Sequence, residues 1–157
     1  ESAEKFYLFL GDEIMGRGEQ AWRGTGLNTV PPQGGTPVAF SGYIHVIDFT
    51  DPMNPKDVAR YEVSEFGTHN SWVEDDVLYQ AYYDGGVRMV DVSGELMGNL
   101  ATQGREIAVF KPFDPDGWAA NVSVVWGAQK YKGNVFFTDL ASGLWSVKLL
   151  PTQRPVS

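Results

Sequence analysis

The sequence contains no cysteine, so disulfide bonds, thiolate metal sites and thiol catalysis are excluded. It also lacks an apolar run long enough to span a bilayer, and residues 1–5 do not form the basic start of a signal peptide. We therefore expect a soluble or processed chain without membrane insertion. Only two histidines are present, which is few for a transition-metal enzyme.

Basic residues are scarce and scattered. The chain carries 12 lysines and arginines against 20 aspartates and glutamates, for a net charge of −8, and the basic residues form no cluster. This charge repels phosphate backbones and anionic lipid headgroups. We therefore expect neither nucleic acid nor a membrane surface as a partner.

Aromatic residues and glycine are plentiful. Aromatics make up 13% of the 157 residues, and the chain holds 18 glycines and nine prolines. No stretch shows the periodicity of an amphipathic helix longer than about two turns. Short strands joined by tight turns have this composition, which predicts an all-β fold.

An internal repeat sets the expected architecture. Residues 69–91 align without a gap on residues 126–148, an offset of 57, so that Gly86 matches Gly143. A third copy begins the chain, with residues 6–10 matching one strand pattern and residues 44–48 the next. A repeated unit of short strands buries little surface alone, so the copies are expected to pack face to face, as the blades of a β-propeller do.

The strand patterns predict one incomplete propeller region over residues 1–157, made of four-stranded antiparallel blades. Calling the strands of a blade A to D, the first blade (residues 5–63) has strands B to D at 5–11, 43–49 and 57–63, with a long B–C loop at 14–41. The second blade (68–110) has strands A to D at 68–73, 77–83, 86–92 and 105–110. The third blade has strands A to C at 122–130, 134–138 and 143–150, and the tail 151–157 carries two prolines and no alternation.

Two pentads carry a family resemblance. Residues 44–48 (Ile-His-Val-Ile-Asp) and 87–91 (Val-Arg-Met-Val-Asp) resemble the LVIVD repeat, whereas the third copy ends in Lys148 instead of Asp. The resemblance implies the C-terminal portion of a β-propeller of the kind found in secreted and cell-surface bacterial proteins. It therefore implies an extracytoplasmic location, and it is nearly silent on activity.

The strand count predicts about two and a half to three blades, whereas propellers typically need at least four. The fold is then incomplete without further residues or chains. We expect the missing blades, from the same polypeptide or from another chain, to be partners of this region.

Long loops are expected to gather on one face. The B–C and D–A connections of a propeller share a face, which places loop 14–41, with six glycines and three prolines, beside loop 111–121. Long loops on a rigid scaffold commonly bind ligands. The predicted binding face comprises Trp22, Arg23, His69, Asn70, Asp84, Trp118 and Trp126.

The tryptophans of this face could stack a sugar ring or a peptide proline. Trp126 could equally plug the central channel of the propeller.

Carboxylates also end strands on this face. A divalent cation such as calcium could bind there, with Asp12, Glu13 and His69 as the best candidate ligands and Asp84 and Asp139 nearby. Alternatively, aspartates at strand ends are ordinary turn formers that bond the local backbone. His45 is expected to be a half-buried or surface residue without a ligand role.

No catalytic constellation emerges from the sequence, so no catalytic residue is predicted, and the only cofactor it suggests is the divalent cation considered above. The favoured function is a non-enzymatic interaction propeller that binds a protein or glycan through its loop-rich face. One alternative is a metal-dependent hydrolase or oxidoreductase with its site at the channel mouth. The other is a structural subunit of a filament or larger extracellular assembly, joined through an open sheet edge.

Overall fold

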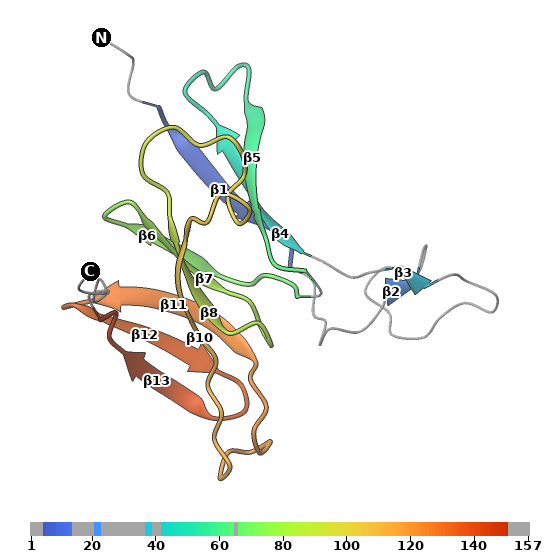
Figure 1. Ribbon diagram of the computed structural model, residues 1–157, viewed down its shortest axis with the longest axis vertical. Coiled ribbons are helices and arrows are strands. Elements are labelled where there is room, and N and C mark those ends of the chain that lie inside the picture. Colours follow the sequence, from blue (N-terminus) through green and yellow to red (C-terminus); the bar gives the residue numbers. More distant parts are fainter. Residues whose placement is uncertain (1–4, 14–20, 23–36, 39–41, 65, 151–157) are drawn as a thin grey trace, which may run out of the picture.

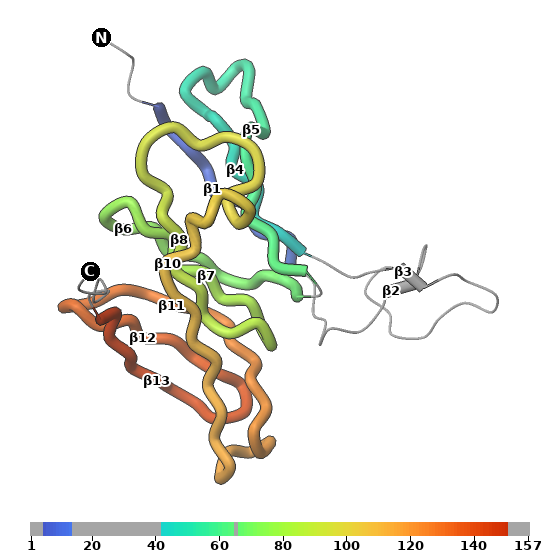
Figure 2. The backbone as a smooth tube through the Cα atoms, in the orientation of Figure 1, coloured from blue at the N-terminus to red at the C-terminus, as the bar shows by residue number. Residues whose placement is uncertain are grey.

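A computed structural model describes residues 5–13, 21–22, 37–38, 42–64 and 66–150, with only the backbone described at 21–22 and 37–38. These residues form strands and turns and contain no helix, which confirms the all-β prediction; accordingly, no bilayer-spanning helix occurs among them. Three sheets follow one another along the chain, and none closes on itself (Figure 1). The backbone trace passes through them in turn, except that it returns to the first sheet at Gly98–Asn99 before it completes the middle sheet at Glu106–Phe110 (Figure 2).

The first sheet has the strand order β1-β4-β5-β9. It contains β1 (Tyr7–Gly11), β4 (Tyr43–Asp48), β5 (Lys56–Glu62) and β9 (Gly98–Asn99). The first three are antiparallel neighbours at the positions expected from the sequence. Strand β9 was not predicted; it comes from a later connection and pairs in parallel with Ala59 and Arg60 of β5, which covers part of that edge of the sheet.

The middle sheet has the order β10-β8-β7-β6 and is fully antiparallel. It contains β6 (Ser71–Glu74), β7 (Val77–Ala81), β8 (Val87–Asp91) and β10 (Glu106–Phe110). Asp75 and Asp76 turn the chain between β6 and β7 with φ values of 51° and 57°, a left-handed conformation that aspartate tolerates.

The third sheet contains β11 (Val125–Tyr131), β12 (Asn134–Asp139) and β13 (Gly143–Val147) in that order. A further short pair, β2 (Ala21–Trp22) with β3 (Pro37–Val38), lies inside the connection from β1 to β4 that was predicted as the long B–C loop. The sequence did not predict this pair. A pair of two-residue strands is too short to show in a hydrophobic pattern.

Alternating side chains place apolar residues between adjacent sheets. The first interface, between the first and middle sheets, buries Ile44, Val46, Ala59, Tyr61, Leu78, Tyr82, Val90, Val92, Leu96 and Leu100. The second interface, between the middle and third sheets, buries Tyr79, Ala81, Val87, Met89, Val125, Ala128, Val135 and Phe137. The middle sheet is thus covered on both faces.

The aspartate that ends each pentad has a structural role. The Asp48 carboxylate accepts a hydrogen bond from the Thr50 amide at 3.1 Å, and Asp91 accepts one from the Ser93 amide at 2.8 Å. Hydrogen bonding by the side chains and then by the amides of Thr50 and Ser93 holds the pKa of the Asp48 and Asp91 carboxyls below the usual range. The aspartates therefore fix the turn that leaves β4 and β8.

The connections on one side of the sheets meet one another. We call the loop side the described segments 12–13, 66–70, 82–86, 111–124 and 139–142, where β1, β7 and β12 end and β6 and β11 begin. Backbone hydrogen bonds join these segments across sheets, from Thr68 to Asp12 and from Asn70 to Trp126, for example. This side therefore gathers residues from all three sheets.

Candidate binding site on the loop side

Four side chains from three sheets converge on the loop side. Glu13 follows β1, His69 precedes β6, Tyr83 follows β7 and Trp126 lies in β11. We call this group the junction cluster. Its members touch in pairs: the His69 and Trp126 rings stack with centroids 5.3 Å apart, and the His69 and Tyr83 rings meet edge to face at 5.4 Å.

Hydrogen bonds fix the orientation of His69. Its Nδ1 lies 2.6 Å from the carbonyl oxygen of Trp126, and because a carbonyl oxygen only accepts, Nδ1 carries the proton and donates. The other ring nitrogen, Nε2, then faces the Glu13 carboxylate at 3.7 Å. The imidazole is held by the third sheet and directed toward the first.

Tyr83 ties the cluster together. Its backbone exchanges two hydrogen bonds with Val125, at 3.1 and 3.0 Å, while its hydroxyl donates to Glu13 at 3.0 Å. Burial and this hydrogen bond raise the pKa of the Tyr83 hydroxyl well above its usual value. Its φ of 40° is costly for a bulky side chain, and such conformations persist where the surroundings enforce them, often at functional sites.

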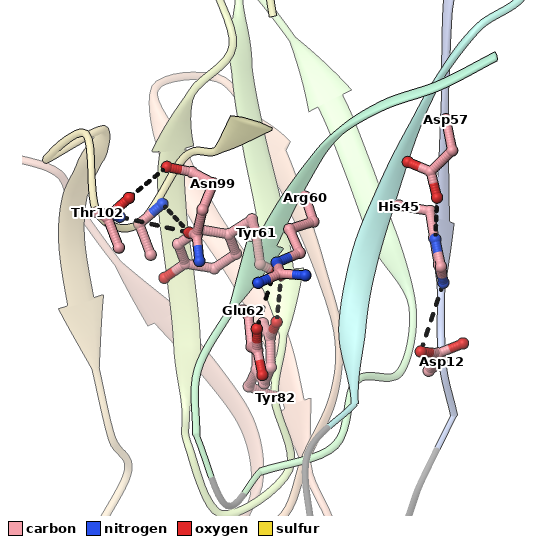
Figure 3. Close-up of polar contacts among 10 residues, drawn as sticks. Asp12, His45, Asp57, Arg60, Tyr61, Glu62, Tyr82, Asn99 and Thr102 are labelled. Atoms are coloured by element: carbon pink, nitrogen blue, oxygen red, sulfur yellow. Dashed lines mark hydrogen bonds and ion pairs between the residues drawn. The ribbon is translucent and has the colours of Figure 1, made fainter. Parts of the chain in front are cut away.

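A second polar group lies on the outer face of the first sheet (Figure 3). The Nδ1 of His45 lies 2.6 Å from an Asp57 carboxylate oxygen, and its Nε2 lies 3.5 Å from Asp12. The ring is thus aligned between two carboxylates. The half-buried position of His45 matches the prediction, but the sequence did not indicate either acidic neighbour.

The candidate metal ligands are divided between these two groups. Asp12 lies beside His45, whereas Glu13 lies beside His69. Within the described part of the chain, no group of three or more His, Cys, Asp or Glu side chains is placed to hold a metal ion. The described residues Asp12, Glu13 and His69 therefore do not form one common cation site.

Asp139 behaves as a turn former. Its buried carboxylate accepts hydrogen bonds from the Ala141 amide, the Ser142 amide and the Ser142 hydroxyl at 3.0, 2.8 and 2.7 Å, and another from the Val124 amide. These bonds occupy the side chain within the turn between β12 and β13. The alternative interpretation of strand-end aspartates is thus confirmed at this position.

Large apolar side chains are exposed next to this turn. Trp118 is 87% exposed, Leu140 56% and Phe113 54%. The two loops that carry them are joined, because the Trp118 amide donates to the Ala141 carbonyl at 2.7 Å and the Leu140 amide to the Val124 carbonyl at 2.9 Å. We call Phe113, Trp118 and Leu140 the apolar rim.

The remaining residues of the predicted binding face lie at several places on the loop side or outside the described residues. Asn70 is exposed beside the junction cluster, and Asp84 is half-buried in the turn that follows Tyr83. Trp126 is 39% exposed, so one part of its ring system faces solvent and another contacts His69. Arg23 and the side chain of Trp22 lie outside the described residues.

No protein-family model, curated protein or solved structure matches the chain.

Sequence reasoning missed two residues of these groups. Tyr83 was assigned to a strand, and its contact with Glu13 spans 70 residues of sequence. Asp57 could have been found from the repeat, because it pairs opposite Ile47 as Glu106 pairs opposite Val90. The position equivalent to His45 is Arg88, which forms an ion pair with Glu106 at 2.7 Å, so in the first two copies the side chain at this place contacts a carboxylate.

Proposed function

We propose that this chain is a segment of a β-propeller that acts as an interaction module and binds a protein or glycan partner through its loop side. The observation that carries the proposal is the apolar rim, which lies in the loops of the same side as the junction cluster. Exposed apolar groups that gather on one face of a soluble protein commonly mark an interaction site. The loops on that face are held by backbone hydrogen bonds, as a preformed binding surface requires.

The propeller arrangement is supported by the repetition of the sheets. Each sheet packs on the next through equivalent strand positions, and β11 of the third sheet contacts β6 and β7 of the middle sheet, as inner strands of adjacent blades do. Further blades, from the same polypeptide or another chain, belong to this proposal. Membership of the LVIVD-repeat family and an extracytoplasmic location are also part of this proposal, and both rest on the resemblance of the pentads.

The chemistry of the surface suggests its ligand class. Indole rings stack on sugar faces and on peptide prolines, and Glu13, 66% exposed at its side chain, offers acceptor oxygens for hydroxyl or amide donors. Trp118 is the most exposed of the described tryptophans and is therefore expected to dominate the contact energy.

The experiment screens the purified chain against an array of immobilised glycans and a library of displayed peptides, then measures the affinity of each hit for variants. Trp118→Ala should weaken binding by at least about tenfold, the loss typical of a central aromatic contact. The matched control is Trp72→Ala, because Trp72 is also exposed but lies in β6, away from the loops. Hits that bind the Trp118 variant as tightly as the wild type would refute the proposal, as would an absence of hits.

A further inference from the structure

The outer face of the third sheet is apolar and uncovered among the described residues. The repeat aligns Leu144 with Val87 and Phe136 with Tyr79. Val87 and Tyr79 are 0% and 4% exposed, because the third sheet covers them, whereas Leu144 is 72% exposed and Phe136 is partly exposed. The third sheet thus presents the face that the middle sheet buries.

The outer face of the first sheet is equivalent to the face of the middle sheet that the first sheet buries. Leu8 pairs opposite Ile47 and Leu10 opposite His45, just as Leu78 pairs opposite Val90 and Gln80 opposite Arg88 in the middle sheet. Leu78 and Gln80 are 0% exposed beneath the first sheet, but Leu8 and Leu10 are 38% and 58% exposed. The first sheet therefore presents the face that would receive a preceding sheet.

The second interface shows how these two kinds of face fit. There Val135 and Phe137, which occupy the positions of Leu8 and Leu10, pack against the sheet that carries Tyr79 and Val87. On the outer face of the third sheet, a hollow of about 410 Å³ is lined by Phe136, Thr138 and Leu144 together with Gly127, Gln129 and Asn70. Leucine side chains at the positions of Leu8 and Leu10 would enter such a hollow.

We propose that the outer face of the third sheet binds the outer face of the first sheet in a second copy of this chain. The interface is head to tail, since two different faces meet, and two such contacts close a ring of two copies. Each copy supplies three sheets, so the ring holds six, within the usual range of about four to eight blades. The inference rests on the propeller arrangement proposed above and is independent of the loop-side ligand.

The test uses Leu10→Glu and Leu144→Glu, which place a charge on one face each without touching a buried position. Molar mass is measured by light scattering during size-exclusion chromatography over about a hundredfold range of concentration. The wild type should form a dimer, and each variant alone should be monomeric because both contacts of its ring are damaged. Met53→Glu is the matched control, since Met53 is 85% exposed in the connection between β4 and β5, and it should remain dimeric.

Mixing the two variants tests whether the contact joins two different faces or two identical ones. Leu10→Glu retains an intact third sheet and Leu144→Glu an intact first sheet, so the mixture should recover a heterodimer through one undamaged contact. A wild type that is monomeric throughout, or that forms open polymers, would overturn the proposal. So would a dimer that only Leu144→Glu disrupts, because identical faces would then be meeting. Unchanged circular dichroism of both variants confirms that they fold.

This test also remains separate from the loop-side function. Leu10 and Leu144 lie on sheet faces, whereas Trp118 lies in a loop. If the wild type is monomeric, and Trp118→Ala still weakens the binding of a glycan or peptide hit, the ring is refuted and the binding function stands.

Discussion

The first and second interfaces occupy equivalent strand positions yet differ in chemistry. In the first interface the Tyr61 hydroxyl donates to Glu106, which also pairs with Arg88, and the Tyr82 hydroxyl donates to the Tyr61 carbonyl at 3.0 Å. In the second, Phe110 takes the place of Tyr61 and Trp145 that of Arg88, with ring centroids 5.8 Å apart. The repeat therefore specifies which side chains face a neighbouring sheet but not whether they are polar.

Polar residues can occupy the first interface because each of these groups has a hydrogen-bond partner. A buried polar group is costly unless it is paired, and in the first interface these hydroxyl and charged groups have partners. In the second interface Phe137 stacks on Trp145 with an interplanar angle of 6°, so contact area replaces hydrogen bonds. The two interfaces should therefore respond differently to truncation, to backbone strain and to pH.

The largest effect is expected from Phe137→Ala. Phe137 is 1% exposed at the centre of the second interface, and truncating such a phenylalanine leaves a cavity that costs about 3–5 kcal/mol. Urea unfolding monitored by circular dichroism measures this loss of unfolding free energy. Phe113→Ala is the control, because the Phe113 side chain is 54% exposed in the connection between β10 and β11 and is not part of either interface. Equal losses in both variants would show that the second interface does not stabilise the fold as described.

A smaller effect should separate two equivalent glycines. Gly86 and Gly143 have φ values of 80° and 86°, so alanine is strained at both and costs roughly 1 kcal/mol or more from the backbone alone. At Gly86 the added Cβ would also overlap the carbonyl oxygen of Phe110 in β10, whereas at Gly143 no atom lies within 4 Å. Gly86→Ala should therefore lose about 1–2 kcal/mol more than Gly143→Ala.

The same urea titrations check the glycine comparison. Indistinguishable unfolding midpoints for the two variants would mean that the backbone of β10 moves away without cost, which would contradict the close packing described for the middle sheet.

The strands were the predictable part of this molecule. Alternating apolar residues, Gly86 and the paired aspartates 75–76 mark each strand and turn of the middle sheet locally, and the repeat transfers the pattern to the third sheet. Strand β9 could not be predicted in this way, because two residues carry no periodicity and their pairing with β5 depends on the path of the intervening chain. The short pair β2 and β3 escaped detection for the same reason.

The candidate site was less predictable than the sheets. The repeat and the expected propeller topology indicated which segments share the loop side, and they gave His69 and Trp126 equivalent positions in adjacent copies. Only the structure shows that the two rings stack. The sequence could not show that Asp12 and Glu13, adjacent in the chain, face different histidines, because the packing of distant segments decides which histidine each carboxylate meets. Nor could it show that Tyr83 adopts a positive φ. In that conformation the Tyr83 backbone forms its two hydrogen bonds with Val125.

The smallest effect tests the polar chemistry of the first interface through pH. Burial, together with the hydrogen bond to Glu106, raises the pKa of Tyr61 far above the usual value near 10. Above about pH 10 the unfolded chain releases this proton while the folded chain retains it, so protonated Tyr61 stabilises the fold below pH 10 and that stability declines as the pH rises. Tyr61→Phe removes this contribution and gives the first interface the aromatic residue that the second has in Phe110.

At pH 7 the loss of one hydrogen bond should cost Tyr61→Phe about 1 kcal/mol. Between about pH 10 and pH 11.5 the unfolding free energy of the variant should fall less steeply than that of the wild type, so the two curves should converge. Urea unfolding at a series of pH values measures both quantities. Parallel curves would mean that Tyr61 releases its proton as readily in the folded chain as in the unfolded one, which neither its burial nor its bond to Glu106 permits.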